Sequence, residues 1–224
     1  MTHTFPLRFA AFALILSLAA ALQPASARAA TTAQAEHFVQ VNIDRGLGIL
    51  SNKGLSEAQR RHEFRQFLLE LADIRRTALF TLGAGRRTAT PAQVDDFVEA
   101  FKNYAIAIYQ ARLSAFSGQR LKVKGGIQRA PGDFIVETDL VQPSTSSDEK
   151  PIQVDFRLVP DNSGFKVIDV GVVGVWLAIE ERDQFTSFLD QHNDSVPTLT
   201  QHLQALTQRL REHPQTAQEK KSAM

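Results

Sequence analysis

Two short stretches could bind a ligand, and both fall short of the motif they resemble. Gly83-Ala84-Gly85 begins like a dinucleotide-binding fingerprint, but the third glycine is absent and a helical pattern precedes it instead of a strand. Residues 190–194 present oxygen-bearing side chains at alternate positions, as a calcium loop does, without the loop's glycine or distal glutamate. The sequence therefore favours a helix-ending glycine turn at the first stretch and a polar linker between helices at the second.

The sequence also shows no recognisable set of catalytic residues. The sequence contains no G-x-S-x-G stretch, which would present a nucleophilic serine on a sharp turn. Glu180 and Glu181 are adjacent, so on a helix their side chains project about 100° apart and are poorly placed to share a proton. The six histidines show no metal-ligand spacing. We therefore expect a protein that is not an enzyme, with no catalytic residues, no metal and no cofactor.

Three arginine pairs remain as a charged feature: Arg60-Arg61, Arg75-Arg76 and Arg86-Arg87. They fit a solvated helical surface with local ion pairs, which is the ordinary role of such residues. They also fit a docking surface for an acidic partner or for lipid headgroups. The sequence alone leaves both interpretations open.

The first 29 residues have the pattern of a secretory signal peptide. Arg8 supplies positive charge, an apolar run follows over residues 9–22, and Ala27-Arg28-Ala29 fits the small-residue cleavage pattern. The apolar run is shorter than the roughly 20 residues that a membrane-spanning helix needs. We therefore predict an exported protein with one folded domain over residues 30–211 and a disordered polar tail over residues 212–224.

Composition narrows the class of protein further. Removing residues 1–29 takes away Arg8 and Arg28, so the formal charge changes from +1 to −1 and the exported form is nearly neutral. Nucleic-acid binding requires a strongly basic domain, so we do not expect it. Because the chain has no cysteine, its fold must be stabilised by core packing without disulfides, and no cysteine-linked lipid anchor is expected. The remaining length suits a single domain, which we expect to be monomeric.

Alternating residues between positions 120 and 174 predict the sheet that organises the chain. Apolar and polar side chains alternate over residues 121–127, 134–140 and 152–158, and residues 165–170 begin a fourth run. Turn-forming residues separate the runs. The pattern predicts an antiparallel meander with one apolar face and one polar face. The apolar face must be covered by other elements.

Helical patterns occupy the rest of the chain and supply that cover. Ser56 and Thr90 each stand three residues before a glutamine, which is the capping box that opens a helix. We therefore predict an α+β fold, in which a curved four-stranded antiparallel sheet is covered by N-terminal and C-terminal helices. Fifteen phenylalanines fit either an ordinary core or a dry apolar cavity between these layers, and composition does not distinguish the two.

Several short stretches occur together in this order of elements: Leu82-Gly83, Arg86-Arg87, Thr90-Pro91-x-Gln93, Phe97, Phe101, Tyr109, Leu113, Phe116-Ser117-Gly118-Gln119, Val136-x-Thr138, Pro151-Ile152-x-Val154 and Gly164-Phe165-Lys166-Val167-Ile168-Asp169-Val170. In these stretches the chain resembles, over about residues 34–211, the MlaC or toluene-tolerance family. Members of that family are the periplasmic phospholipid-binding components of the Mla ABC transport system. The family's Gly-Val-Ser-Leu stretch and downstream Arg-x-x-Phe correspond to Gly174-Val175-Trp176-Leu177 and Arg182-x-x-Phe185, so Trp176 replaces a small serine.

The resemblance implies a periplasmic shuttle that carries phospholipid between an inner-membrane ABC transporter complex and an outer-membrane lipoprotein complex, for lipid homeostasis of the envelope. It implies an apolar cavity between sheet and helices, and the residues we expect to line it are Phe97, Phe101, Ile108, Val136, Ile152, Val154, Phe156, Val175 and Trp176. Since Trp176 could reshape this cavity, a polycyclic lipid such as a hopanoid is an alternative ligand. A lipid-free adaptor of an envelope complex and a small exported enzyme are the alternative functions.

Overall fold

A computed structural model describes residues 30–113, 118–142 and 150–213 of the chain. The predicted signal peptide (1–29) and nearly all of the predicted tail (212–224) lie outside these residues. The helices are α1 (Thr32–Ser51), α2 (Glu57–Leu71), α3 (Ile74–Leu82), the 3-10 turn η1 (Gly83–Arg87), α4 (Pro91–Leu113), α5 (Leu177–Gln191) and α6 (Val196–Glu212). The strands are β1 (Arg120–Ala130), β2 (Asp133–Val141), β3 (Ile152–Asp161), β4 (Gly164–Val172) and β5 (Val175–Trp176).

The predicted capping boxes open α2 and α4. The Ser56 hydroxyl accepts a hydrogen bond from the Gln59 backbone N–H, and the Gln59 side chain accepts one from the Ser56 N–H in return. Thr90 and Gln93 form the same reciprocal pair at the start of α4. Each box satisfies two backbone donors that a helix N-terminus leaves unpaired.

The five strands form one antiparallel sheet in the order β1-β2-β3-β4-β5, which confirms the predicted meander and adds one short strand. The added strand β5 is two residues long and follows a tight turn at Val173 and Gly174, whose φ angles are 51° and 81°. Two consecutive positive φ angles are typical of the turns that join antiparallel strands. Two residues are too short to show alternation, so the sequence pattern did not predict β5.

The sheet has one apolar and one polar face, as the alternation predicts. Val136 pairs with Phe156, which pairs with Val170, and these residues define the inner face. Glu137 pairs with Asp155, which pairs with Gly171, and these define the outer face. Residues paired across antiparallel strands point to the same side, so each face can be followed from strand to strand.

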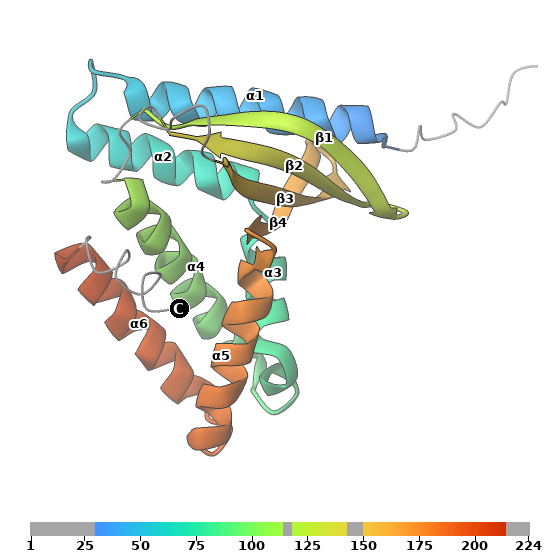
Figure 1. Cartoon of the computed structure of the whole chain (residues 1–224). Helices are drawn as coiled ribbons and strands as arrows, with labels where there is room; N and C mark the ends of the chain where they lie inside the picture. Colours follow the sequence, from blue (N-terminus) through green and yellow to red (C-terminus); the bar gives the residue numbers. More distant parts are fainter. Residues whose placement is uncertain (1–29, 114–117, 143–149, 214–224) are drawn as a thin grey trace, which may run out of the picture.

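Helix α1 lies across part of the inner face, with α2 beside it (Figure 1). It approaches β1 so closely that a Cβ atom at Gly126 would come within 3.0 Å of the Thr32 side chain. Between α1 and the sheet lies the sheet core, a cluster of buried apolar side chains from both: Ala35, Val39, Ile43, Phe134, Val136, Leu158, Phe165 and Val167.

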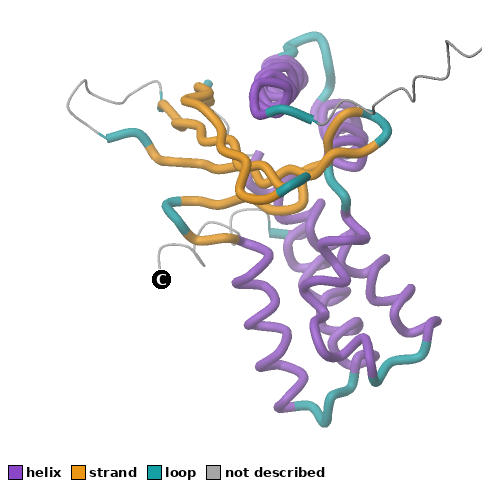
Figure 2. The backbone as a smooth tube through the Cα atoms, turned by 90° about the vertical axis from the view of Figure 1, so that its right-hand side faces the viewer, coloured by secondary structure: helices purple, strands orange, loops and turns teal. Residues whose placement is uncertain are grey.

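Helices α3, α4, α5 and α6 form a bundle that lies below the sheet layer (Figures 1 and 2). This bundle has a second cluster of its own, the bundle core: Ala78, Leu82, Phe97, Val98, Ala100, Phe101, Tyr104, Phe185, Leu189, Val196, Leu199 and Leu203. None of the described helices combines the length and the hydropathy that crossing a membrane would require.

Strand β4 joins the bundle to the sheet. The Asp73 backbone N–H donates to the Val167 carbonyl at 2.9 Å, and the Thr77 hydroxyl donates to the Ile168 carbonyl at 3.0 Å. A register shift in the β3–β4 ladder lies beside this junction. The fold therefore consists of two packed bodies that meet at β4, through α3 and α5, and also where α2 packs on α4.

Candidate functional site

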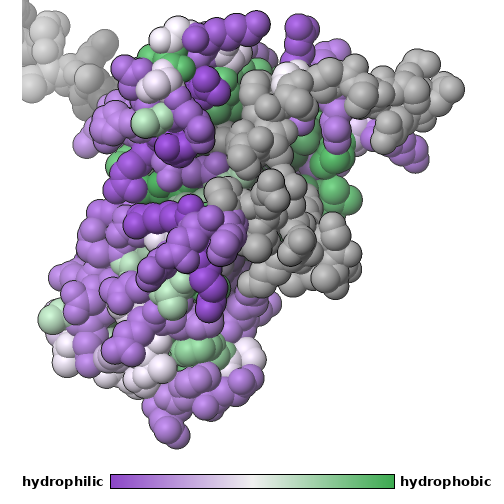
Figure 3. Space-filling model, turned by 90° about the vertical axis from the view of Figure 1, so that its left-hand side faces the viewer, coloured by the Kyte–Doolittle hydropathy of each residue, from purple (hydrophilic) through white to green (hydrophobic). Residues whose placement is uncertain are grey.

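The part of the inner face that α1 leaves uncovered is the first candidate site. Its side chains are apolar and only partly buried: Leu140, Ile152, Val154, Phe156, Val170 and Val172. They come from three neighbouring strands and lie in register, because Leu140 pairs with Ile152 and Val154 pairs with Val172. We call these six residues the open inner face. Figure 3 shows hydrophobic side chains at the level between the sheet layer and the bundle.

Polar groups are kept off this surface. Thr138 is the polar residue of β2 on the inner face, and its hydroxyl donates to the Val154 carbonyl at 2.6 Å, so no donor is left facing the surface. The carboxylates of Asp155 and Asp169 point to the outer face instead. An apolar surface of this kind can hold hydrocarbon, and it offers no group for acid–base or nucleophilic chemistry.

The outer face carries a charge network around Asp133. Arg157 donates two hydrogen bonds to the Asp133 carboxylate, at 2.9 and 3.0 Å, and Arg129 donates a third at 2.9 Å. Partial burial acts to raise the pKa of Asp133, but the two guanidinium groups outweigh it and hold that pKa below its usual value. The same contact raises the pKa of Arg157. This network stabilises the β1–β2 and β2–β3 pairing rather than forming a site.

Asp169 has a structural role at the start of α5. Its carboxylate accepts hydrogen bonds from the backbone N–H groups of Ala178 and Val170, at 2.9 and 2.8 Å. Burial is the largest influence on this carboxyl and raises its pKa, while the hydrogen bonds and Arg157 act in the opposite direction. Asp169 therefore ties α5 to β4.

Five of the nine residues predicted to line a cavity share the inner face. Ile152, Val154 and Phe156 belong to the open inner face. Val136 lies on the same face but is fully buried beneath α1. Val175 continues the face at its edge through its pairing with Val172, and 51% of its surface is exposed.

The other four predicted residues lie elsewhere. Phe97 and Phe101 belong to the bundle core, where both rings lie nearly perpendicular to the Phe185 ring, and Ile108 packs against the same core. Helix α4 packs mainly on α6, and these side chains lie in or against the bundle core. The structure does not bring them together with the residues of β2 and β3, because hydrophobic periodicity identifies a buried helix face but not its partner. Their contact with lipid stays a prediction.

Trp176 lies on the outer face. It pairs with Gly171, and a Cβ atom at Gly171 would come within 3.3 Å of the indole ring, so the ring covers the space left by that glycine. Because Gly171 and Val172 point to opposite sides of β4, Trp176 is on the other side of the sheet from Phe156. The structure therefore places Trp176 apart from the inner-face residues with which it was grouped, and its contact with lipid stays a prediction.

Sequence reasoning missed three members of the open inner face: Leu140, Val170 and Val172. The alternation of apolar and polar residues indicates them as well, because they occupy inward-facing positions of the same pattern. The described residues contain no group of three or more side chains that could hold a metal ion.

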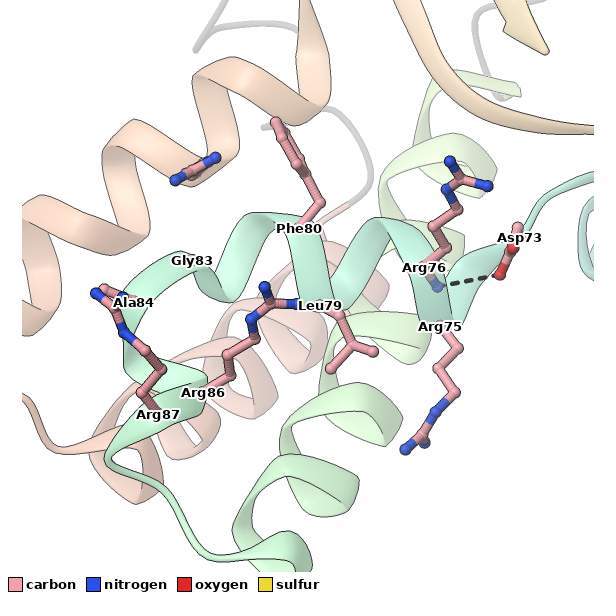
Figure 4. Close-up of a pocket in the computed structure, with 10 residues that line it drawn as sticks. Asp73, Arg75, Arg76, Leu79, Phe80, Gly83, Ala84, Arg86 and Arg87 are labelled. Carbon is pink, nitrogen blue, oxygen red and sulfur yellow. Dashed lines mark hydrogen bonds between the residues drawn. The ribbon is translucent and has the colours of Figure 1, made fainter. Parts of the chain in front are cut away.

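A second candidate site lies on the bundle, where α3, η1 and α5 meet. It is a depression of about 600 Å³, lined by Asp73, Arg75, Arg76, Leu79, Phe80, Gly83, Ala84, Arg86, Arg87 and Arg182. We call it the arginine pocket (Figure 4). It brings together two of the three arginine pairs noted in the sequence, while Arg61 of the remaining pair forms an ion pair with Glu57 on α2.

A curled, unclosed antiparallel sheet with helices over its apolar face places the chain in the α+β class. The family model described as "MlaC protein" matches residues 40–205, and the chain therefore belongs to the MlaC family. Among solved structures, it resembles a phospholipid-binding protein from Ralstonia solanacearum, solved in complex with a phospholipid, with a TM-score of 0.64 and 23% sequence identity. The alignment covers 81% of this chain and 99% of that protein. No curated protein matches the chain in a sequence comparison.

Proposed function

We propose that this protein is a phospholipid carrier of the periplasm that takes the acyl chains of its ligand against the open inner face. The observation that carries the proposal is the set of six partly exposed apolar side chains on three adjacent strands. A sheet face with this composition is ordinarily covered, because exposed apolar area is unfavourable in water. Family membership and the ligand of the Ralstonia solanacearum protein support a phospholipid as the cover.

The physical case for a carrier rests on the cost of exposing hydrocarbon. Each methylene moved out of an apolar environment into water costs about 0.8 kcal/mol. Two acyl chains of about sixteen carbons each therefore present a barrier on the order of 25 kcal/mol to a lipid that leaves a membrane alone. A protein that shields the chains lowers this barrier without covalent chemistry. Binding and transport, rather than catalysis, is accordingly the role we propose.

The proposal extends to location and partners. The pattern of residues 1–29 supports export, and family membership supports the periplasm as the compartment. A monomeric shuttle in that compartment would exchange lipid with an inner-membrane ABC transporter complex and an outer-membrane lipoprotein complex. Nucleic acid is not among the proposed partners, because the exported chain is nearly neutral.

The test is solvent extraction of the protein purified from its native compartment, with the extract analysed by mass spectrometry. We expect about one phospholipid per protein. A stoichiometric polycyclic lipid such as a hopanoid would keep the carrier role and change the ligand. An empty, folded protein that also fails to take up phospholipid from vesicles would refute the carrier role and favour the lipid-free adaptor.

A further inference from the structure

The arginine pocket concentrates positive charge in a protein that is otherwise nearly balanced. Five arginines and one aspartate line it, a formal surplus of four positive charges, whereas the whole chain carries +1. Arg75 is bound to Asp95 at 2.9 Å, which reduces the surplus to three. The Asp73 carboxylate accepts the backbone N–H of Arg76 as the N-cap of α3, so it is engaged with the helix end.

Three of the pocket's guanidinium groups are available to a ligand. The structure records no ion pair for Arg76, Arg86 or Arg87 within the residues it describes, and all three side chains are exposed. In Figure 4 Arg86 extends back along α3 toward Leu79, while Arg75 and Arg76 extend to different sides of that helix beside Asp73.

The pocket also has an apolar wall and a position that only glycine fits. Phe80 is 37% exposed, and the Arg182 guanidinium carbon lies 5.0 Å from the centroid of its ring. Gly83 has a φ of 57°, and a Cβ atom there would come within 3.3 Å of the Arg182 Nε atom. Because Gly83 has no side chain, Arg182 of α5 can pack directly against η1. The Phe80 ring stabilises the Arg182 guanidinium in this position.

This chemistry suits phosphate. A guanidinium presents several N–H donors in a planar fork that matches the oxygens of a phosphate group, and it stays charged at any physiological pH. A depression with exposed aromatic and aliphatic side chains beside the charges fits a headgroup together with the glycerol region below it. The pocket contains no lysine, so each cation in it has the fork geometry.

We propose that the arginine pocket is a membrane-docking site that binds the phosphate-bearing headgroups of anionic phospholipids at a bilayer surface, separate from the open inner face. The choice of a bilayer as the source of phosphate rests on the proposed function, since a lipid carrier must meet membranes. Helix α3 links the two sites, because it carries four residues of the pocket wall and its N-terminal end is hydrogen-bonded to β4. Docking through the pocket therefore holds the sheet at a defined orientation to the membrane.

The experiment is vesicle flotation of the purified protein at low ionic strength. Vesicles of phosphatidylcholine alone are compared with vesicles that also contain phosphatidylglycerol. We expect binding to the phosphatidylglycerol vesicles only, decreasing with added salt. The double variant Arg86→Gln/Arg87→Gln should bind these vesicles about thirtyfold more weakly. This factor follows from the affinity that two basic residues ordinarily add at an anionic membrane surface. The matched control, Arg209→Gln/Arg211→Gln on α6, removes the same charge outside the pocket and should bind like the unmodified protein.

Other outcomes would overturn the proposal. Equal loss in both double variants would mean that net charge, and not the pocket, governs binding. Saturable binding of inorganic phosphate without vesicle binding would identify a free anion as the ligand, and binding of polyglutamate without vesicle binding would identify an acidic protein. Lipid extraction from the same preparations separates this proposal from the carrier role, because a protein that floats with vesicles but carries no lipid would retain docking and lose transport.

Discussion

Replacing Val154 with aspartate tests the open inner face most directly. Val154 is partly exposed and lies between Thr138 and Val172 on the neighbouring strands. In the lipid-free protein an aspartate there keeps contact with water, so the change should lower the free energy of unfolding by only about 1–2 kcal/mol. Under bound acyl chains the same carboxylate would lose its water without gaining a partner, at a cost of several kcal/mol. Even about 3 kcal/mol weakens lipid binding at least a hundredfold.

The assay for this variant measures lipid per folded protein. Lipid content is read by extraction and mass spectrometry, and folding is followed by chemical denaturation of the same sample. Ile127→Asp is the matched control, because it exchanges an exposed apolar residue for the same charge on the opposite face of the sheet. If Val154→Asp remains folded and retains as much lipid as the unmodified protein, the open inner face does not contact the ligand.

Three further substitutions test other parts of the structure. Phe97→Ala should lower the free energy of unfolding by about 3–5 kcal/mol, because the side chain is fully buried, yet the folded fraction should retain its lipid; loss of lipid would put Phe97 in the site. Gly171→Val should displace the ring of Trp176, shift the fluorescence of this single tryptophan and cost about 1–3 kcal/mol, whereas an unchanged spectrum would contradict the contact. Because the pKa of Asp169 is raised above 3.8 in the folded protein, the folded state binds this proton more tightly, and stability should fall as pH rises from 3.8 toward the raised value. Urea denaturation at several pH values should show that this part of the decrease is absent in Asp169→Asn.

Local structure was largely predictable from the sequence. The capping boxes at Ser56 and Thr90 mark helix starts because their hydrogen bonds are made within four residues. The alternation over β2 and β3 defines which side chains share a face, because a strand has a period of two. Such signals depend on near neighbours in the chain, so a single sequence contains them.

Contacts between elements were not predictable in the same way. The apolar stripe that contains Phe97 predicts that one side of α4 is buried, but packing on α6 and packing on the sheet satisfy the stripe equally well. The side on which Trp176 lies depends on a turn at Val173 and Gly174 that makes a strand of two residues. The arginine pocket depends on α3 ending after nine residues, so that η1 returns Arg86 and Arg87 toward α5. For α4 and for the arginine pocket the deciding partner, α6 or α5, is distant in sequence. For Trp176 it is a local turn that leads into a strand too short to show alternation.

The division into a sheet core and a bundle core gives the molecule a seam. Among the described residues the two cores share no side chain. The bodies meet through hydrogen bonds of α3 and α5 with β4 and through the contact of α2 with α4, where the Gln110 side chain donates to the Arg61 carbonyl at 3.0 Å. Opening along the seam would break these contacts while both cores remain packed, so we expect it to require less free energy than unfolding either body. Hydrogen exchange should accordingly separate amides at the junction, which open often, from amides within each core, which open only on unfolding. We therefore expect brief local opening at the seam to precede the unfolding of either core.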